Sequence, residues 1–227
     1  MRIEIKGFLE TSFVDWTGKV CSVLFLPYCN FRCPYCHNHP LVFHPEKYHS
    51  LPLEDILSRL HSFRGWIDGV CITGGEPTLH ADLPILIGTI RQHGFSVKLD
   101  TNGSNPQLLE NLIEARQIDF VSMDVKAPLD PFSYRRSTGL SIDLTPILRS
   151  IEILKRKRVD YEFRMTVVPG LHRKEDVKIL GSQLRGGPKF ILQNFNPGDP
   201  LDPSFKDIVP YDLKVLKEME KEVQAIV

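Results

Sequence analysis

Three cysteines lie within eight residues of one another, in the segment Cys29-Asn-Phe-Arg-Cys33-Pro-Tyr-Cys36. Thiolate sulfur is the ligand that iron–sulfur clusters take from proteins. Three thiolates at this spacing can ligate three irons of a four-iron cluster, and the fourth iron is then left open to a ligand that is not protein. An iron without a protein ligand can take part in a reaction, so the cysteine spacing predicts a reactive site rather than a purely structural one.

A structural zinc site is the main alternative for these cysteines. Structural zinc takes four protein ligands, usually arranged as two pairs, and no second pair follows in the sequence. His37 and His39 are available as a fourth ligand, but both crowd the same short loop. Cys21 and Cys71 stand inside apolar runs, where cysteine acts as a small buried hydrophobe. A non-catalytic zinc or iron–sulfur binding module therefore stays the alternative from another class of function.

Composition argues against several kinds of partner. The 28 Lys and Arg residues balance 28 Asp and Glu residues, so the strong positive field of a general nucleic-acid binder is missing. No stretch approaches the apolar length of a membrane helix, and residues 1–6 lack the apolar core of a signal peptide. We expect a cytoplasmic protein with no nucleic-acid or membrane partner. In a reducing cytosol, clustered cysteines suit metal binding better than disulfides.

Short apolar runs alternate with amphipathic stretches along the chain. The runs predict buried parallel strands at Val20–Leu26, Gly69–Thr73, Ser96–Asp100, Phe120–Val125, Tyr161–Val168 and Lys189–Asn194. The stretches predict helices at Leu53–Phe63, Leu83–Gly94, Pro106–Arg116, Asp143–Arg158, Lys174–Leu184 and Tyr211–Val223. Six strand–helix units fall short of the eight that close a full barrel. We expect an α/β fold, an incomplete (β/α)6 TIM-type barrel, in one domain over residues 1–227 with its core at about 18–197 and a C-terminal helix at 211–223.

Each predicted strand ends in a polar or glycine-rich signature. In chain order these are Cys29, Gly74-Gly75-Glu76-Pro77, Asp100-Thr101-Asn102-Gly103, Asp124-Val125-Lys126, Val168-Pro169-Gly170 and Gln193-Asn194-Phe195-Asn196-Pro197. Barrel enzymes build their active sites at the carboxyl ends of the strands. The six signatures are therefore expected to surround one site.

The cysteine spacing, followed by the other signatures in this order, resembles the radical S-adenosylmethionine (SAM) enzymes. The resemblance implies a [4Fe-4S] cluster on Cys29, Cys33 and Cys36 whose open iron binds the amino and carboxylate groups of SAM. Gly74-Gly75-Glu76-Pro77 resembles the motif that holds the methionyl amino group, and paired glycines allow a sharp turn close to a ligand. Tyr35 matches the aromatic position that lies near adenine in the family.

A longer stretch looks like the glycyl-radical-enzyme activases. It runs over residues 7–19, GFLETSFVDWTGK, and on through Tyr35-Cys36-His37-Asn38, and the likeness extends roughly to Pro197. It is closest to the activating proteins of anaerobic ribonucleoside-triphosphate reductase and more distant from pyruvate formate-lyase activating enzyme. The resemblance implies one electron from a flavodoxin or ferredoxin, reductive cleavage of SAM, and a glycyl radical formed on a partner enzyme.

The same resemblance assigns roles at the later strand ends. Asp100-Thr101-Asn102-Gly103 resembles the activases' Asp-Thr-Asn-Gly, which places Thr101 and Asn102 among the SAM contacts. In the pyruvate formate-lyase activase this segment, with an Asp-x-Lys on the next strand, helps hold a monovalent cation at the SAM carboxylate. Asp100 and Asp124 would be its carboxylate ligands here, with backbone carbonyls of Thr101 and Ser122, since hard oxygen ligands suit such an ion. The ordinary alternative is that strand-end aspartates cap the following turn or helix.

For two cationic residues, the sequence leaves more than one possible partner. Lys126 shares the strand face of Asp124, so it can meet a carboxylate of SAM or of the substrate peptide, or pair with Asp124. Arg164 lies inside an apolar strand and must be paired. A bidentate carboxylate is its natural partner, either that of SAM or a structural aspartate.

This chain departs from the activases at two places. The residue before the first cysteine is usually glycine and is Tyr28 here; because tyrosine does not readily adopt a positive φ, we expect a different loop conformation. On the sixth strand the pyruvate formate-lyase activase has a histidine near the ribose. This chain offers Gln193 and Asn194 instead, and we take Gln193 as the candidate contact.

A small-molecule enzyme such as 7-carboxy-7-deazaguanine synthase is the alternative within the superfamily. That family typically has Asp-Thr after the third cysteine, where the threonine binds Mg²⁺, whereas His37-Asn38 follow Cys36 here. Enzymes with auxiliary clusters need further sets of cysteines. Only Cys21 and Cys71 remain, so we predict a single cluster.

Overall fold

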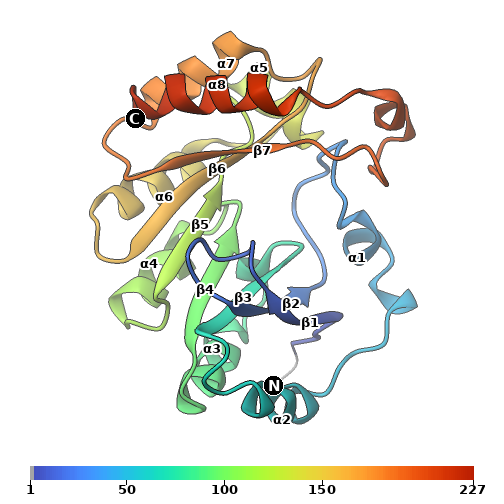
Figure 1. Ribbon diagram of the computed structural model, residues 1–227, viewed down its shortest axis with the longest axis vertical. Helices are drawn as coiled ribbons and strands as arrows, with labels where there is room; N and C mark the ends of the chain where they lie inside the picture. Colours follow the sequence, from blue (N-terminus) through green and yellow to red (C-terminus); the bar gives the residue numbers. More distant parts are fainter. Residues whose placement is uncertain (1–2) are drawn as a thin grey trace.

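A curved seven-stranded sheet organises the molecule in the computed structural model, which describes residues 3–227 (Figure 1). Met1 and Arg2 lie outside the described residues. They belong to residues 1–6, the segment that we expect not to be a signal peptide. The strands neighbour one another in chain order. They are β1 (Gly7–Ser12), β2 (Cys21–Leu26), β3 (Gly69–Gly74), β4 (Ser96–Thr101), β5 (Phe120–Asp124), β6 (Asp160–Val167) and β7 (Phe190–Asn194).

The prediction of six parallel strands in an unclosed barrel is confirmed. Strands β2 to β7 pair in parallel, and their ends differ from the predicted ones by one residue at most, which is within the usual uncertainty of element boundaries. The sheet is not closed, because β1 and β7 stand at opposite edges of the strand order. The six signatures therefore do lie at one end of a half-barrel.

The prediction missed β1. This strand pairs antiparallel with β2, with Gly7 opposite Phe25 and Ser12 opposite Cys21, and the register shifts between Leu9 and Ser12. Its residues are only partly buried, so it lacks the continuous apolar run that marks the other strands. The bulge and the polar sequence hide the alternation of apolar and polar residues that would mark a strand. β1 therefore forms because it pairs with β2 in the folded protein.

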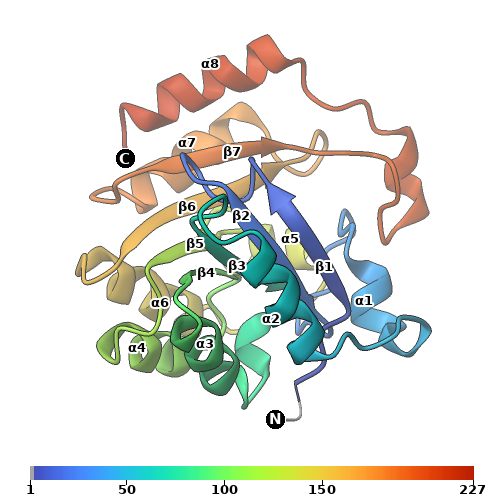
Figure 2. The same cartoon turned by 60° about the horizontal axis from the view of Figure 1, so that its bottom comes forward.

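Helices cover the outer face of the sheet, and Figures 1 and 2 show α3, α4, α6 and α7 ranged along it with α8 beside α7 and β7. Within residues 3–227 no helix has the length and apolarity needed to cross a membrane. The α-helices are α1 (His39–Phe43), α2 (Leu53–Ser62), α3 (Leu83–Gln92), α4 (Pro106–Glu114), α5 (Pro131–Thr138), α6 (Thr145–Lys155), α7 (Lys174–Gln183) and α8 (Leu213–Gln224), with short 3₁₀ helices at η1 (Pro45–Lys47), η2 (Pro77–Leu79) and η3 (Pro203–Asp207).

Local sequence explains why the predicted helices form. In α4, the side chain of Asn105 caps the helix by accepting from the Leu108 amide at 3.2 Å, and Pro106 occupies the first turn. Leu109 and Leu112 then bury one face against the sheet. Helices α1 and α5 were not predicted, because α1 is a single turn and α5 is strongly polar.

Two hydrophobic clusters stabilise the fold. The larger one fills the space between the sheet and its helices. A smaller one lies inside the barrel at the amino ends of the strands and consists of Trp16, Cys21, Val23 and Cys71. Both Cys21 and Cys71 are fully buried there, as predicted. Trp16, from the β1–β2 connection, therefore closes one end of the barrel and leaves the other end to polar residues.

Candidate active site

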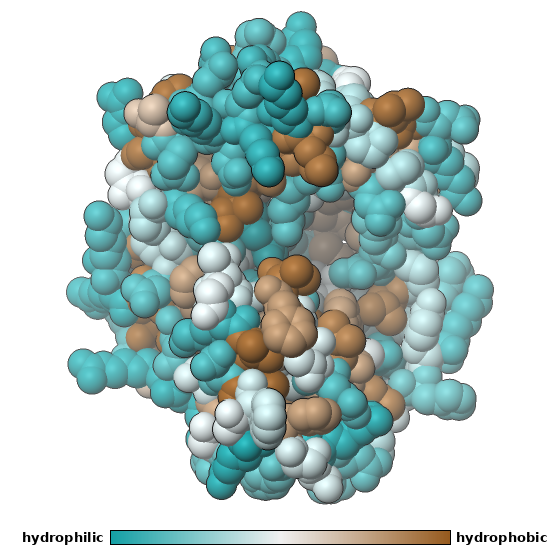
Figure 3. Space-filling model, in the orientation of Figure 1, coloured by the Kyte–Doolittle hydropathy of each residue, from teal (hydrophilic) through white to brown (hydrophobic). Residues whose placement is uncertain are grey.

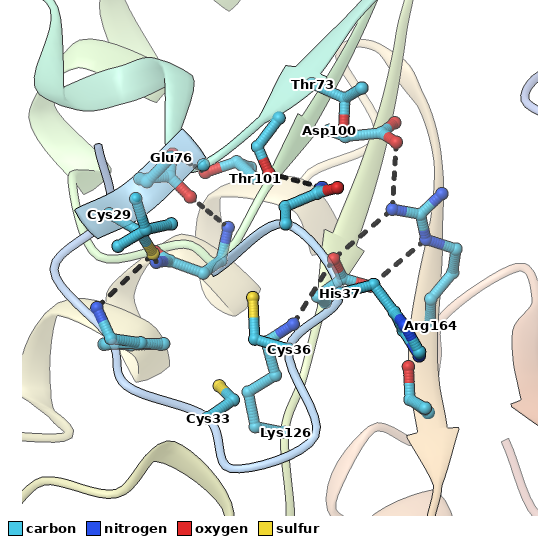
Figure 4. Close-up of a pocket in the computed structure, with 18 of the residues that line it drawn as sticks. Cys29, Cys33, Cys36, His37, Thr73, Glu76, Asp100, Thr101, Lys126 and Arg164 are labelled. Atoms are coloured by element: carbon cyan, nitrogen blue, oxygen red, sulfur yellow. Dashed lines mark hydrogen bonds and ion pairs between the residues drawn. The ribbon is translucent and has the colours of Figure 1, made fainter. Parts of the chain in front are cut away.

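The predicted site residues line one cavity of about 300 Å³ at the carboxyl ends of the strands. Figure 3 shows a hollow near the middle of the face seen in Figure 1, and Figure 4 shows the labelled side chains pointing toward a common space. Every residue that we assigned to the cluster or to SAM from the sequence is in its lining: Cys29, Cys33, Tyr35, Cys36, Gly74, Gly75, Glu76, Asp100, Thr101, Asn102, Asp124, Lys126, Arg164 and Gln193.

Tyr28, just before the first cysteine, adopts a positive φ that we did not expect of tyrosine. Tyr28 has φ 64°, so it adopts the left-handed conformation that glycine favours, at a cost of about 1–2 kcal/mol. Backbone bonds on both sides hold it there: the Tyr28 amide donates to Leu41 O at 3.1 Å, and Tyr28 O accepts from the Glu76 amide at 2.7 Å. The surrounding fold thus imposes the turn on a residue that resists it.

The two glycines serve a close approach of two backbones. A Cβ on Gly75 would lie 1.8 Å from Tyr28 O, and Gly74 has φ 114° with a Cβ position 2.4 Å from Leu26 O. Asn38 adds a side-chain link, donating from Nδ2 to Gly74 O at 2.7 Å. The cysteine loop and the Gly-Gly loop are therefore joined directly, so neither glycine can be replaced without moving the other loop.

Helix α5 supports the cysteine loop from the other side. The Arg32 amide donates to Thr138 O at 2.8 Å, and Gly139 ends the helix with φ 71°. Tyr134 of the same helix is buried, and its hydroxyl accepts from the Lys126 amide at 3.2 Å. An element that the sequence analysis missed thus helps position both the cysteines and Lys126.

Glu76 is a buried connection between two strand ends. Its Oε1 accepts from the Thr78 amide (3.1 Å), the Thr78 hydroxyl (2.6 Å) and the Thr101 hydroxyl (2.7 Å), and its Oε2 accepts from the Asn102 amide at 2.6 Å. Only 1% of the residue is exposed. Burial raises the pKa of Glu76, and the four donors oppose that rise. Its carboxylate thus fixes the Asp-Thr-Asn-Gly segment against the Gly-Gly turn.

A row of alternating charges runs from the barrel interior toward the cysteines; we call Lys98, Asp100, Arg164, Asp124 and Lys126 the charge row. Lys98 pairs with Asp100 Oδ1, and Arg164 Nη2 lies 3.0 Å from Asp100 Oδ2. Arg164 Nε is 3.2 Å from Asp124 Oδ1, and Lys126 Nζ is 3.5 Å from Asp124 Oδ2. Of the two partners considered for Arg164, this structure gives it the aspartates, and it pairs Lys126 with Asp124.

The charge row shifts the pKa values of Asp124 and Lys126. Burial raises the pKa of Asp124, but Arg164 and Lys126 outweigh it and lower the value to about 2. Burial alone would lower the pKa of Lys126, and Asp124 with the three site cysteines raises it instead. Both side chains are therefore charged at neutral pH.

The three cysteines are free thiols in a buried setting. Burial raises the pKa of Cys29 to about 11 and that of Cys33 to about 12, and it raises the pKa of Cys36 as well, while Lys126 opposes all three shifts. A metal must displace these thiol protons when it binds. Lys126 is the positive charge that favours the thiolates.

Tyr35 packs deep in the site beside His172. The two rings meet edge to face with centroids 6.2 Å apart. Within residues 3–227 the Tyr35 hydroxyl is buried without a hydrogen-bond partner, an arrangement that is rare unless a ligand or water completes it. Gln193 lines the cavity from the end of β7, while the neighbouring Asn194 donates to Tyr211 O at 2.6 Å.

Comparison with known proteins identifies the family. Residues 23–181 match the family described as the radical SAM superfamily, which covers more than half of the chain. The chain belongs to the radical SAM superfamily. Membership implies an iron–sulfur cluster and SAM as cofactors.

Two curated proteins are similar to this one over nearly the full chain. A protein of Methanocaldococcus jannaschii named as a glycyl-radical enzyme activating enzyme is 34% identical, covering 97% of this chain and 92% of that protein. The pyruvate formate-lyase-activating enzyme of Clostridium pasteurianum is 26% identical over 96% of this chain and 95% of that protein. This homology indicates a radical SAM enzyme of the glycyl-radical enzyme activating type.

A solved structure shares the fold. A domain of pyruvate-formate lyase-activating enzyme from Bacteroides vulgatus superposes with a TM-score of 0.55, covering 70% of this chain and 94% of that domain at 17% sequence identity. The unclosed, mostly parallel sheet is thus the radical SAM half-barrel.

The residues present fit a radical SAM cluster. Within residues 3–227, no three His, Cys, Asp or Glu side chains are placed to hold a single metal ion. An iron–sulfur cluster instead contains several irons and takes cysteine thiolates as its protein ligands. All three cysteines line one cavity together with the cationic Lys126, and the buried Tyr35 hydroxyl in the same lining has no hydrogen-bond partner within residues 3–227.

Several polar residues in or beneath the cavity lining were not assigned a role from the sequence. Asp15, Asn38, Thr73 and Thr166 line the cavity, and Lys98 underlies it as the innermost member of the charge row. Asp15 and Asn38 stood in the two stretches that carry the activase likeness and could have been found there. Thr73 and Thr166 have only their inward strand positions as a signal, and Lys98 is marked by being a lysine between Val97 and Leu99.

Proposed function

We propose that this protein is an activase that generates a glycyl radical on a partner enzyme, anaerobic ribonucleoside-triphosphate reductase. The observation that carries the proposal is the three-cysteine cavity in a chain similar over 97% of its length to a glycyl-radical enzyme activating enzyme. An electron from a flavodoxin or ferredoxin starts the reaction. The protein is expected to work in the cytoplasm.

The chain's own residues bind and orient the cofactors. Cys29, Cys33 and Cys36 would hold a [4Fe-4S] cluster, and the backbone of the Gly74-Gly75 turn would bind the methionyl amino group of SAM. Lys126, within the cavity lining, would offer positive charge to the SAM carboxylate, and Tyr35 in the same lining would contact the adenine. Bound together, cluster and SAM supply the radical that removes a hydrogen atom from glycine.

The open side of the barrel supports a protein substrate. Because β1 and β7 do not pair, a loop of another protein can reach the cavity from the side.

The small-molecule alternative has less support. An enzyme like 7-carboxy-7-deazaguanine synthase would place a Mg²⁺-binding threonine after the third cysteine. Here Asn38 stands at that place and its amide donates to Gly74 O. This side chain therefore serves the loop connection, and an amide group lacks the hydroxyl that such a site uses.

Anaerobic reconstitution tests the cluster. We expect about four irons per chain in the wild type, loss of SAM cleavage in Cys33→Ala, and retained cleavage in the matched control Cys71→Ala, which alters a buried cysteine of the Trp16 cluster. One tightly bound zinc with no iron, or Cys33→Ala cleaving SAM at the wild-type rate, would show that the assignment is wrong.

Electron paramagnetic resonance tests the partner. The reduced protein, with SAM, is incubated separately with anaerobic ribonucleoside-triphosphate reductase and with pyruvate formate-lyase. A glycyl doublet on the reductase alone supports the proposed partner. A doublet on pyruvate formate-lyase alone refutes that partner while leaving the activase reaction in place.

A further inference from the structure

The Arg164 guanidinium lies between the two carboxylates that the family resemblance assigns to a monovalent cation. Its Nη2 donates to Asp100 Oδ2 at 3.0 Å and to Asp124 Oδ2 at 3.3 Å, and its Nε donates to Asp124 Oδ1 at 3.2 Å (Figure 4). Guanidinium is planar, permanently charged and matched to carboxylate pairs. One residue thus bridges strands β4 and β5 from its place on β6.

The remaining carboxylate oxygen, Asp100 Oδ1, also has a cationic partner. Asp100 Oδ1 pairs with Lys98, whose side chain is fully buried, and Lys126 approaches Asp124 Oδ2 as a second cation. Each of the four carboxylate oxygens therefore has a protein cation beside it. Hard metal ions bind carboxylate oxygens that supply negative charge, and the charge of both aspartates is already compensated by these protein cations.

Charge counting leads to the same result. Three cations of the charge row, Lys98, Arg164 and Lys126, face two carboxylates, Asp100 and Asp124, so the row already carries one net positive charge. Arg164 is 9% exposed and Asp100 is 6% exposed, and repulsion between like charges is strong in such a setting. A fourth cation between the aspartates would add to that repulsion with little water to screen it.

We propose that Arg164 takes the place of the monovalent cation in this protein, so that SAM binding requires neither Na⁺ nor K⁺. Lys98 is the positioning residue of this arrangement, because it neutralises Asp100 from within the barrel and leaves Oδ2 to Arg164. The measurement of SAM affinity rests on the proposed function, because it assumes that the protein binds SAM. The cation readouts below need no SAM.

The first test measures SAM affinity of the cluster-loaded wild type in KCl, NaCl and tetramethylammonium chloride at equal ionic strength. We expect dissociation constants that agree within about twofold. In Arg164→Gln, the affinity should fall about tenfold in tetramethylammonium, as a charge-assisted contact is lost, and K⁺ or Na⁺ should restore part of it. A wild-type affinity that rises about tenfold on adding K⁺ or Na⁺ overturns the proposal.

The second test follows cation binding without SAM. Thermal unfolding of the cluster-free wild type should not distinguish K⁺ from tetramethylammonium, whereas Arg164→Gln should unfold at a higher temperature in K⁺, because an ion that binds only the folded state stabilises it. Arg164→Lys keeps the charge and should stay insensitive to the cation. Arg149→Gln is the matched control, since it removes an exposed arginine that pairs with Glu110.

Crystals soaked in Rb⁺ give a direct readout. Anomalous density between Asp100 and Asp124 in the wild type would refute the proposal, and density found there only in Arg164→Gln would support it. If Arg164→Gln does not fold in any salt, the wild-type measurements alone decide. If cluster-loaded wild type binds no SAM in any salt, the proposed function fails while the unfolding and Rb⁺ results still stand.

Discussion

Replacing Glu76 with glutamine keeps the shape of the side chain and removes one hydrogen-bond acceptor. With the amide oxygen at the Oε1 position, the bonds from Thr78 and Thr101 survive. The amide nitrogen then occupies the Oε2 position, 2.6 Å from the Asn102 nitrogen. Two N–H donors would face each other inside the protein, where no water can accept either proton.

The expected cost follows from these contacts. A hydrogen bond to a charged group contributes roughly 1.5–3 kcal/mol, and a buried donor left unsatisfied costs a further 1–3 kcal/mol. The neutral amide is easier to bury than a carboxylate, which offsets part of the loss. We expect Glu76→Gln to lower the free energy of unfolding by about 2–4 kcal/mol.

Urea unfolding of the cluster-free protein at neutral pH measures this change. Amide hydrogen exchange supplies the local readout, because the Asn102 amide should exchange much faster in Glu76→Gln while amides of α8 should not. Glu114→Gln is the matched control, since Glu114 is exposed and only loosely paired with Arg158. A Glu76→Gln variant within about 0.5 kcal/mol of the wild type, the range of ordinary surface substitutions, would refute this account of Glu76.

Three further predictions concern residues around the site. Burial lowers the pKa of His172 to about 4, below an unfolded value of about 6.5, so the unfolded chain takes up the proton first as the pH falls; wild-type stability should drop by about 2 kcal/mol more between pH 7 and 5 than that of His172→Gln. Equal pH slopes in urea unfolding would contradict this. Gly75→Ala should destabilise the protein by about 3 kcal/mol or more, because its Cβ meets Tyr28 O, whereas Gly88→Ala in α3, with open space at the Cβ position, should stabilise it by about 1 kcal/mol; a Gly75→Ala variant as stable as the wild type would contradict the direct joining of the two loops. Trp16→Ala should lower the free energy of unfolding by about 3–5 kcal/mol, because it leaves a cavity in the cluster of Trp16, Cys21, Val23 and Cys71. An unchanged unfolding temperature in calorimetry would mean that Trp16 is not needed to close this end of the barrel.

The fold was predictable where a strand or helix carries its own pattern. Strands β2 to β7 are covered on both faces, so their apolar runs are continuous and unambiguous. Strand β1 has no such run and forms because β2 has a free edge, and Trp16 reaches the barrel interior only through that pairing. Helix α5 begins at its cap Asp130 and ends at Gly139, yet its polar sequence gives no apolar stripe to recognise.

At the site, the amino-acid sequence alone indicates which chemical groups are available. Cysteine spacing, the glycine pair and the strand-end aspartates are local features, and parallel strands must bring their carboxyl ends together. Tertiary structure decided which groups pair, because pairing depends on distances between strands far apart in sequence. It gave Arg164 to Asp100 and Asp124, placed Lys98 beneath them, and held Tyr28 at a positive φ through bonds to Leu41 and Glu76. No local pattern encodes the two Arg164 contacts, since they arise only when neighbouring strands bring their inward-facing charges together away from water.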